Sequence, residues 1–270
     1  MTPTIAERLH RSLRTGTQMP CPTEADPSID LPAAYRVARA VTALRIKDGE
    51  RPVGRKIGFT NPRIWGEYNV DAPVWGHVYD CTVQDAAASL DLAGLMEPKI
   101  EPEIVFRLGR APSADMDEVA LIGCISHVAH GFEIVQSAYA GWRFRAADSV
   151  MGFGMHGALL LGPWSAIAQG TGAAWQRALA DFTIRLSCDG AEIDRGQATS
   201  ILDQGPLAAI AHLVQLLAND DDAPDLAAGE IVTTGTLTRA FPILAGQTWT
   251  TEIEGLALDG LRVRFEQGGR

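Results

Sequence analysis

After residue 50 the chain repeats one pattern, in which short apolar runs end within a few residues at Gly, Pro or Asp. Such runs are typical of β-strands bounded by turns. They do not alternate regularly with helical segments, which disfavours a doubly wound parallel sheet. We expect strands at 53–59, 74–79, 100–108, 158–161, 182–187, 231–234, 248–253 and 261–265.

The first fifty residues differ, because helical periodicity dominates them. Residues 31–47 are the strongest helix candidate, since Asp30 stands where a capping side chain belongs. Residues 4–13 form a second predicted helix. The sequence therefore predicts an α+β protein, with a helical N-terminal segment at 1–50 and a mostly β catalytic domain at 51–270.

Three further local signals lie in the second part of the chain. Residues 207–217 have a clear helical pattern, and residues 119–129 have a weaker one. The segment Cys188-Asp189-Gly190-Ala191 predicts a hairpin turn, because Asp-Gly readily supplies the positive φ angles that such turns need.

Composition limits the classes of partner. The 270 residues carry a formal charge of −10. This argues against nucleic acids and anionic membranes as partners, since proteins that bind them carry clusters of Lys and Arg. The N-terminus lacks the apolar core of a signal peptide. The four scattered cysteines indicate free thiols in a reducing compartment. We expect a soluble, cytoplasmic protein that acts on a small molecule.

A pair of carboxylates stands out in the segment 98–106. Glu101 and Glu103 are two residues apart in a predicted strand, so both side chains point to the same face. Like charges this close repel unless a positive group lies between them, and a divalent cation is the simplest such group. Glu133, flanked by apolar residues, is the candidate third ligand. The alternative is that the three glutamates are surface charges on edge strands.

Lys56 is a second anomaly, because it lies between two glycines in an apolar run. A buried lysine has a lowered pKa and can act as a general acid or base near neutrality. The alternative is a surface lysine whose stem packs along the protein while its ammonium group stays in water.

Several apparent motifs do not carry chemistry. Residues 152–157 match G-x-G-x-x-G, but the apolar run that follows is stopped by Gly-Pro and predicts a strand, whereas a dinucleotide site needs a helix there. His127 and His130 have the spacing of a helical metal pair, yet their weakly helical context favours packed or solvated side chains. Neither a G-x-S-x-G elbow nor a P-loop is present in the sequence.

The chain resembles a known enzyme group over most of its length, from about Leu31 onward. It is similar to the 2-keto-4-pentenoate hydratase and 4-oxalocrotonate decarboxylase group of the fumarylacetoacetate hydrolase superfamily. The segments that carry the resemblance follow one another in order: G-R-K-I-G-F-T-N-P at 54–62, W-G-H-V-Y-D at 75–80, I-E-P-E-I at 100–104, F-E-I-V-Q-S at 132–137, G-E-I-V-T-T-G at 229–235 and E-I-E-G-L at 252–256.

This resemblance implies a fold, a cofactor and residue roles. The fold would be the superfamily's mixed β-roll with a helical N-terminal part, usually assembled into homo-oligomers. Glu101, Glu103 and Glu133 would hold Mg²⁺ or Mn²⁺. Lys56 would be the acid/base residue, with Asp80 near it as a second polar or proton-handling group.

The sequence departs from the group's pattern in two places. Where the hydratases usually carry Asp-Asn followed by small or hydroxyl residues, this chain has Gly-Phe-Gly-Met-His at 152–156. Phe153 and His156 are therefore the candidate substrate-binding residues, with His156 where a Ser is common. The arginine that often follows the third-glutamate motif is replaced by the segment 138–139, Ala-Tyr.

The activity implied is that of a hydro-lyase in aromatic-compound catabolism. It would add water to a 2-hydroxy-2,4-dienoate and give a 4-hydroxy-2-oxo acid, with the cation stabilising an enolate and Lys56 moving its proton. The same enolate would serve a 4-oxalocrotonate-like decarboxylase or an acylpyruvate-type C–C hydrolase. A non-catalytic descendant is the third hypothesis.

Overall fold

The structure is a computed structural model that describes residues 3–68, 70, 72–85 and 87–268. It combines helices with two mixed sheets, which confirms the predicted α+β class. In the described part of the chain, every helix is too short or too polar to cross a bilayer.

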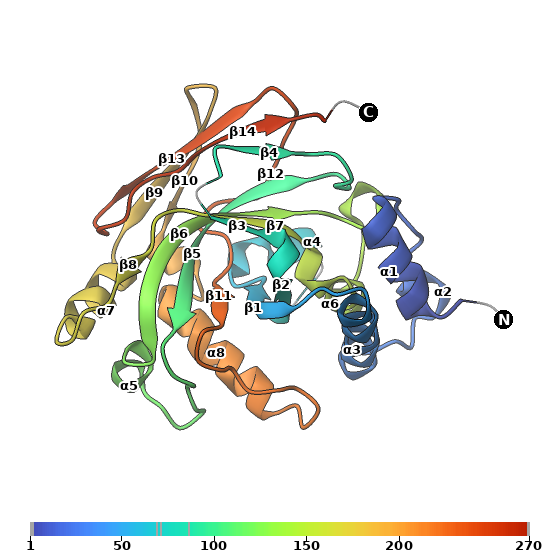
Figure 1. Cartoon of the computed structure of the whole chain (residues 1–270), viewed down its shortest axis with the longest axis horizontal. Coiled ribbons are helices and arrows are strands. Elements are labelled where there is room, and N and C mark those ends of the chain that lie inside the picture. Colours follow the sequence, from blue (N-terminus) through green and yellow to red (C-terminus); the bar gives the residue numbers. More distant parts are fainter. Residues whose placement is uncertain (1–2, 69, 71, 86, 269–270) are drawn as a thin grey trace.

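The elements follow one another as shown in Figure 1. The α-helices are α1 (Ile5–Thr15), α2 (Pro22–Ala25), α3 (Leu31–Lys47), α4 (Trp65–Tyr68), α5 (Glu118–Ile122), α6 (Ala146–Met151), α7 (Gly172–Ala180) and α8 (Pro206–Ala218). The strands are β1 (Pro52–Gly58), β2 (Val74–Tyr79), β3 (Val83–Asp85), β4 (Ser89–Asp91), β5 (Lys99–Leu108), β6 (Ile125–Val135), β7 (His156–Leu161), β8 (Ser165–Ala166), β9 (Thr183–Cys188), β10 (Ala191–Gln197), β11 (Ile231–Thr233), β12 (Phe241–Pro242), β13 (Thr248–Glu254) and β14 (Arg262–Glu266).

The larger sheet is rolled. Its strands follow the order β2-β1-β11-β5-β6-β7-β3, so β2 and β3 are at opposite edges. The chain nevertheless passes from β2 to β3 through the single 3₁₀ turn Asp80–Thr82. Three residues span at most about 10 Å. The two edges must therefore lie close together, and the sheet curls around an interior.

Apolar side chains fill part of that interior. Residues facing each other across neighbouring strands point to the same side, so the inward side chains form layers. One layer is a buried apolar cluster that draws on four strands, and its members are Val78, Val105, Leu159, Leu161 and Ile231. Glu103 precedes Val105 by two residues on β5, and Glu133 of β6 pairs directly with Leu159 of β7.

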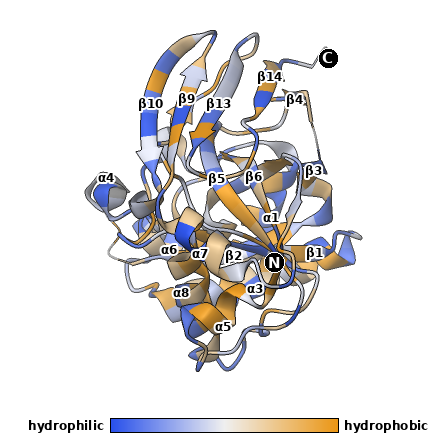
Figure 2. Ribbon diagram, turned by 90° about the vertical axis from the view of Figure 1, so that its left-hand side faces the viewer, coloured by the Kyte–Doolittle hydropathy of each residue, from blue (hydrophilic) through white to orange (hydrophobic). Residues whose placement is uncertain are grey.

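Three further clusters cover the outside of the roll. The five-stranded sheet β10-β9-β13-β14-β4 packs over one side, and α8 with α5 and α7 packs on another (Figure 1). The helices α1 and α3 pack with α6 against a third part. Figure 2 shows the matching hydropathy, with hydrophobic residues along α8 and mostly hydrophilic residues along the edge strand β10.

The predicted helix at 119–129 is wrong in its second half. The helix α5 ends at Ile122, and β6 begins at Ile125 and pairs with β5 along almost its whole length. Long-range pairing thus overrides a weak local helical pattern. In a strand, His127 and His130 point to opposite faces, and His130 is buried between the carbonyl of Glu103 and the hydroxyl of Thr251. The strand β7 confirms the prediction of a strand after the glycine-rich segment.

Candidate metal centre and active site

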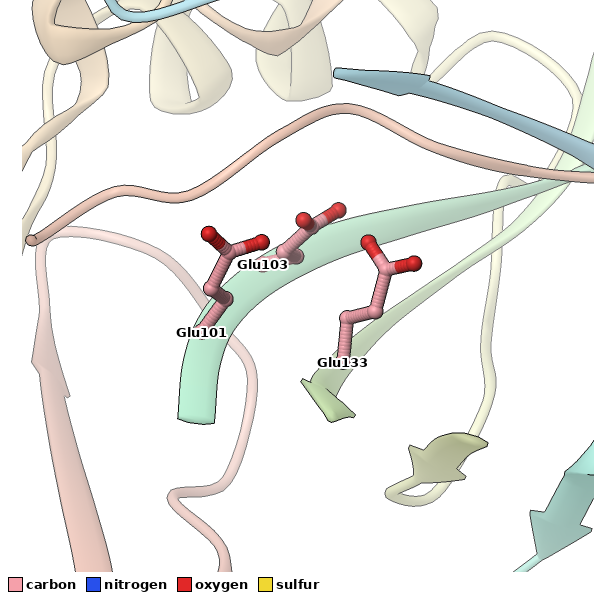
Figure 3. A group of neighbouring side chains, drawn as sticks. All are labelled: Glu101, Glu103 and Glu133. Carbon is pink, nitrogen blue, oxygen red and sulfur yellow. The ribbon is translucent and has the colours of Figure 1, made fainter. Parts of the chain in front are cut away.

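Three glutamates converge on the inner face of the roll. Glu101 and Glu103 lie two residues apart on β5, and Glu133 is directly opposite Glu101 on the antiparallel strand β6. Their carboxylate groups point into the same space (Figure 3), and one oxygen from each lies within 4.8 Å of the others. The register of two neighbouring strands therefore produces the cluster, with no loop needed to close it.

These carboxylates fit a hard divalent cation. Glu103 and Glu133 are fully buried, which excludes solvated surface charges for both residues. Glu103 Oε2 accepts a hydrogen bond from the backbone N–H of Gly235 at 2.9 Å. Glu103 Oε1 has no hydrogen-bond partner within the described residues, and Glu133 Oε2 has no partner there other than the ammonium group of Lys56. Buried carboxylate oxygens without partners are costly, and oxygen-only ligand sets suit Mg²⁺, Mn²⁺ or Ca²⁺.

Lys56 brings a buried positive charge beside these carboxylates. It lies in β1, between Gly76 of β2 and Thr233 of β11, and is only 2% exposed. Its Nζ is 3.0 Å from Glu133 Oε2. Of the two alternatives for Lys56, the structure shows the buried side chain and not the surface lysine, and its ammonium group faces the three carboxylates.

Burial and charge push the carboxyl pKa values apart. Burial raises the pKa of Glu101 to about 7 and the pKa of Glu103 well above its usual range. Burial alone would also raise the pKa of Glu133, but the charge of Lys56 and the hydrogen bond with His156 outweigh it and lower that pKa to about 2. Without a cation, Glu133 is thus the carboxylate that stays ionised at neutral pH.

Cation affinity should therefore depend on pH. A cation bound to all three carboxylates needs them ionised, so it must displace the protons that Glu101 and Glu103 hold. Since the pKa of Glu101 is raised to about 7, we expect Mn²⁺ affinity to fall by more than about tenfold between pH 7.5 and pH 5.5. Isothermal titration calorimetry in buffers of different ionisation enthalpy would measure both the affinity and the released protons. An affinity that does not change with pH would contradict the assignment.

His156 contacts one of the three carboxylates, that of Glu133. Its Nδ1 is 2.7 Å from Glu133 Oε1, and its Nε2 is 2.8 Å from the Thr82 hydroxyl. The ring is 4% exposed. His156 thus joins a site carboxylate to the turn that connects β2 with β3.

A pocket opens beside Lys56 and Glu101. Its other walls include Trp142, Met155 and the segment 58–61. Met155 ends a tight turn in which Phe153, Gly154 and Met155 all have positive φ. A side chain at Gly154 would lie 3.2 Å from the Lys56 stem, so a glycine lets the turn lie against that lysine. Positive φ in two non-glycine residues is strained and marks a position fixed by its surroundings.

The other predicted site residues lie away from this pocket. The carboxylate of Asp80 pairs with Arg51 at 2.9 Å and accepts hydrogen bonds from the backbone of Arg51 and Cys81, at the far end of the β1–β2 ladder. The ring of Phe153 is buried and packs edge-on against Tyr79. Two residues of the unusual segment 152–156, Gly154 and Met155, line the pocket, whereas Phe153 and His156 are not among its lining residues.

Sequence reasoning missed three contributors to the site. The Gly235 amide binds Glu103, Thr82 binds His156, and Trp142 forms a wall of the pocket. The sequence did contain a signal for Gly235, because Thr-Thr-Gly directly follows an apolar run, as at the end of a strand. In the structure this glycine has a φ of 92°. Thr82 and Trp142 belong to short 3₁₀ turns, whose placement depends on the whole roll.

Comparison with known proteins places these residues in a family context. Residues 84–263 match the family described as fumarylacetoacetate (FAA) hydrolase C-terminal. A 2-keto-4-pentenoate hydratase of Paraburkholderia phymatum is 31% identical over 245 residues, which covers 90% of this chain and 89% of the relative. A 4-oxalocrotonate decarboxylase of a Pseudomonas species is 25% identical over 252 residues, covering 93% and 94% of the two chains.

A solved structure shows the same fold. The 4-oxalocrotonate decarboxylase from Pseudomonas putida G7, complexed with magnesium and adipate, superposes with a TM-score of 0.86 at 22% identity. The match covers 96% of this chain and 95% of that chain. The helical N-terminal part and the rolled sheet thus occur together in both proteins.

Proposed function

The chain belongs to the fumarylacetoacetate hydrolase family, and on that premise we propose that it is a divalent-metal-dependent hydratase. The proposed substrate is a 2-hydroxy-2,4-dienoate, and the product is a 4-hydroxy-2-oxo acid. The observation that carries the proposal is the convergence of Glu101, Glu103 and Glu133 beside a buried Lys56. The similarity to a 2-keto-4-pentenoate hydratase along 90% of the chain supports the reaction type.

The proposed roles follow from the chemistry of each side chain. Glu101, Glu103 and Glu133 hold Mg²⁺ or Mn²⁺, as their oxygen-only donor set favours. When bound, such a cation supplies Lewis-acid stabilisation of the enolate form of a 2-oxo acid. Lys56 moves the proton that the substrate's 2-hydroxyl group loses and that a chain carbon gains. Water then adds across the remaining double bond, its oxygen to C4 and a proton to C3.

The surroundings of Lys56 suit a proton carrier. Burial lowers its pKa, whereas Glu133, Glu101 and Glu103 raise it and prevail in the absence of a cation. A dication among those carboxylates would offset their charge and leave burial as the main influence on the pKa of Lys56. Filling the centre would thereby prepare the lysine to release its proton.

A decarboxylase acting on a dicarboxylate is the second candidate. A hollow of about 350 Å³ shares Asn61 with the pocket, and its lining includes Arg63, Arg195 and Arg239 together with Asp194. Arg195 also pairs with Glu192. A carboxylate at the far end of a substrate would meet complementary charge there. The similarity to a 4-oxalocrotonate decarboxylase supports this alternative.

Mass spectrometry of the products would separate these two reactions. The enzyme should be given 2-hydroxypenta-2,4-dienoate and, separately, 2-hydroxymuconate, each with Mg²⁺ and again with a chelator. We expect metal-dependent gain of water on the monocarboxylate. Metal-dependent loss of carbon dioxide from the dicarboxylate would establish the decarboxylase instead. No metal-dependent change in either substrate would contradict both proposals.

Self-association is a further proposal, made from family resemblance. Two large apolar side chains on the described surface, Val119 and Leu244, are 67% and 65% exposed in the single chain. Light scattering coupled to size-exclusion chromatography would give the oligomeric state, and a monomer at micromolar concentration would contradict the proposal.

A further inference from the structure

The position of His156 allows an inference about how the metal centre is held in shape. We propose that His156 is a positioning residue, which fixes the Glu133 carboxylate for the cation through a hydrogen bond from Nδ1 to Oε1. The inference rests on the proposed metal-dependent function. It assigns to His156 a role behind the site in place of contact with substrate.

The two carboxylate oxygens of Glu133 contact different partners. Oε1 lies 2.7 Å from His156 Nδ1, while Oε2 faces Lys56 Nζ at 3.0 Å. An ionised carboxylate only accepts hydrogen bonds, so the ring must donate at Nδ1. The bond therefore fixes the rotation of the carboxylate and leaves Oε2 directed toward the other site groups. Hydrogen-bonded partners of this kind orient metal ligands in many proteins.

The opposite edge of the imidazole is fixed as well. Nε2 lies 2.8 Å from the Thr82 hydroxyl, whose one proton can be donated either to this nitrogen or to the Tyr79 carbonyl, also 2.8 Å away. Thr82 belongs to the turn that joins the two edges of the rolled sheet. Because both ring nitrogens are engaged and the ring is buried, His156 has one orientation available.

Variants at two positions separate positioning from general structural support. Asparagine at 156 carries an N–H at about the place of Nδ1, whereas glutamine carries one nearer the place of Nε2. We expect His156→Asn to bind Mn²⁺ within about threefold of the wild type, and His156→Gln and His156→Ala to lose about 10- to 100-fold in affinity. Thr251→Val, the matched control, removes a hydroxyl that lies 2.8 Å from Nε2 of the buried His130, and it should lower the melting temperature while leaving Mn²⁺ affinity within about threefold.

Mn²⁺ binding is measured by isothermal titration calorimetry on the full chain, with circular dichroism to verify folding. If His156→Ala does not fold, the contrast between Asn and Gln alone decides the question. Equal Mn²⁺ affinity in wild type, His156→Gln and any folded His156→Ala variant would overturn the inference, as would loss of affinity in Asn and Gln alike. Failure of the wild type to bind Mn²⁺ would instead contradict the proposed function itself.

Discussion

Replacing Glu101 with glutamine is expected to lower Mn²⁺ affinity by more than about a hundredfold and to abolish turnover, while the fold survives. Partners that only orient a ligand contribute 10- to 100-fold to metal affinity, so loss of a ligand charge should cost more. The fold should tolerate the change because burial already raises the pKa of Glu101 to about 7, which makes its neutral form readily accessible. Calorimetry with Mn²⁺, a thermal melt and a hydration assay measure the three quantities.

Glu266→Gln is the matched control, since Glu266 is exposed on β14 in the five-stranded sheet. It should change neither metal affinity nor activity. If Glu101→Gln unfolded the protein, the carboxylates would be structural. If the variant kept full activity with Mg²⁺, Glu101 would not be a ligand.

Replacing Lys56 with methionine is expected to separate metal binding from catalysis. Turnover should fall by about 10²- to 10⁴-fold, the usual contribution of a general acid or base. Mn²⁺ affinity should stay equal or increase, because the variant no longer places an ammonium group beside the cation. The metal-free variant should be less stable than the wild type, since Glu133 loses its ion pair, and Mn²⁺ should restore much of that stability.

The control for this substitution is Lys47→Met, which removes an exposed lysine from the last turn of α3. Its activity and metal affinity should match those of the wild type. Joint loss of activity and Mn²⁺ binding in Lys56→Met would mean that the lysine supports the centre structurally. Unchanged turnover would assign the proton transfer to another group.

The part of the site that the sequence predicted depends on local periodicity. Glu101 and Glu103 share a face because any strand alternates its side chains, and the strand around them was evident from its composition. Glu133 could be proposed because a carboxylate in an apolar run needs a partner. What the sequence did not contain is the register that sets Glu133 opposite Glu101, since pairing is decided by the whole sheet.

The parts that local reasoning could not predict depend on contacts between distant segments. His156 was expected to meet substrate, but its nitrogens contact Glu133 and Thr82, residues 23 and 74 positions away in the chain. The weak helical pattern near residue 125 gave way to a strand for the same reason, because its partners lie in β5 and β7. Such contacts follow from the rolled sheet, which no short segment specifies.

The apolar layer next to the glutamates has a consequence for how substrate enters the site and how product leaves it. Val78, Val105, Leu159 and Leu161 are at most 2% exposed and block the interior beyond Glu103. The rolled sheet is therefore closed at that end, so reactants enter and products leave through the same opening. A product molecule must depart before the next substrate arrives, and inhibition by product should accordingly be competitive with substrate.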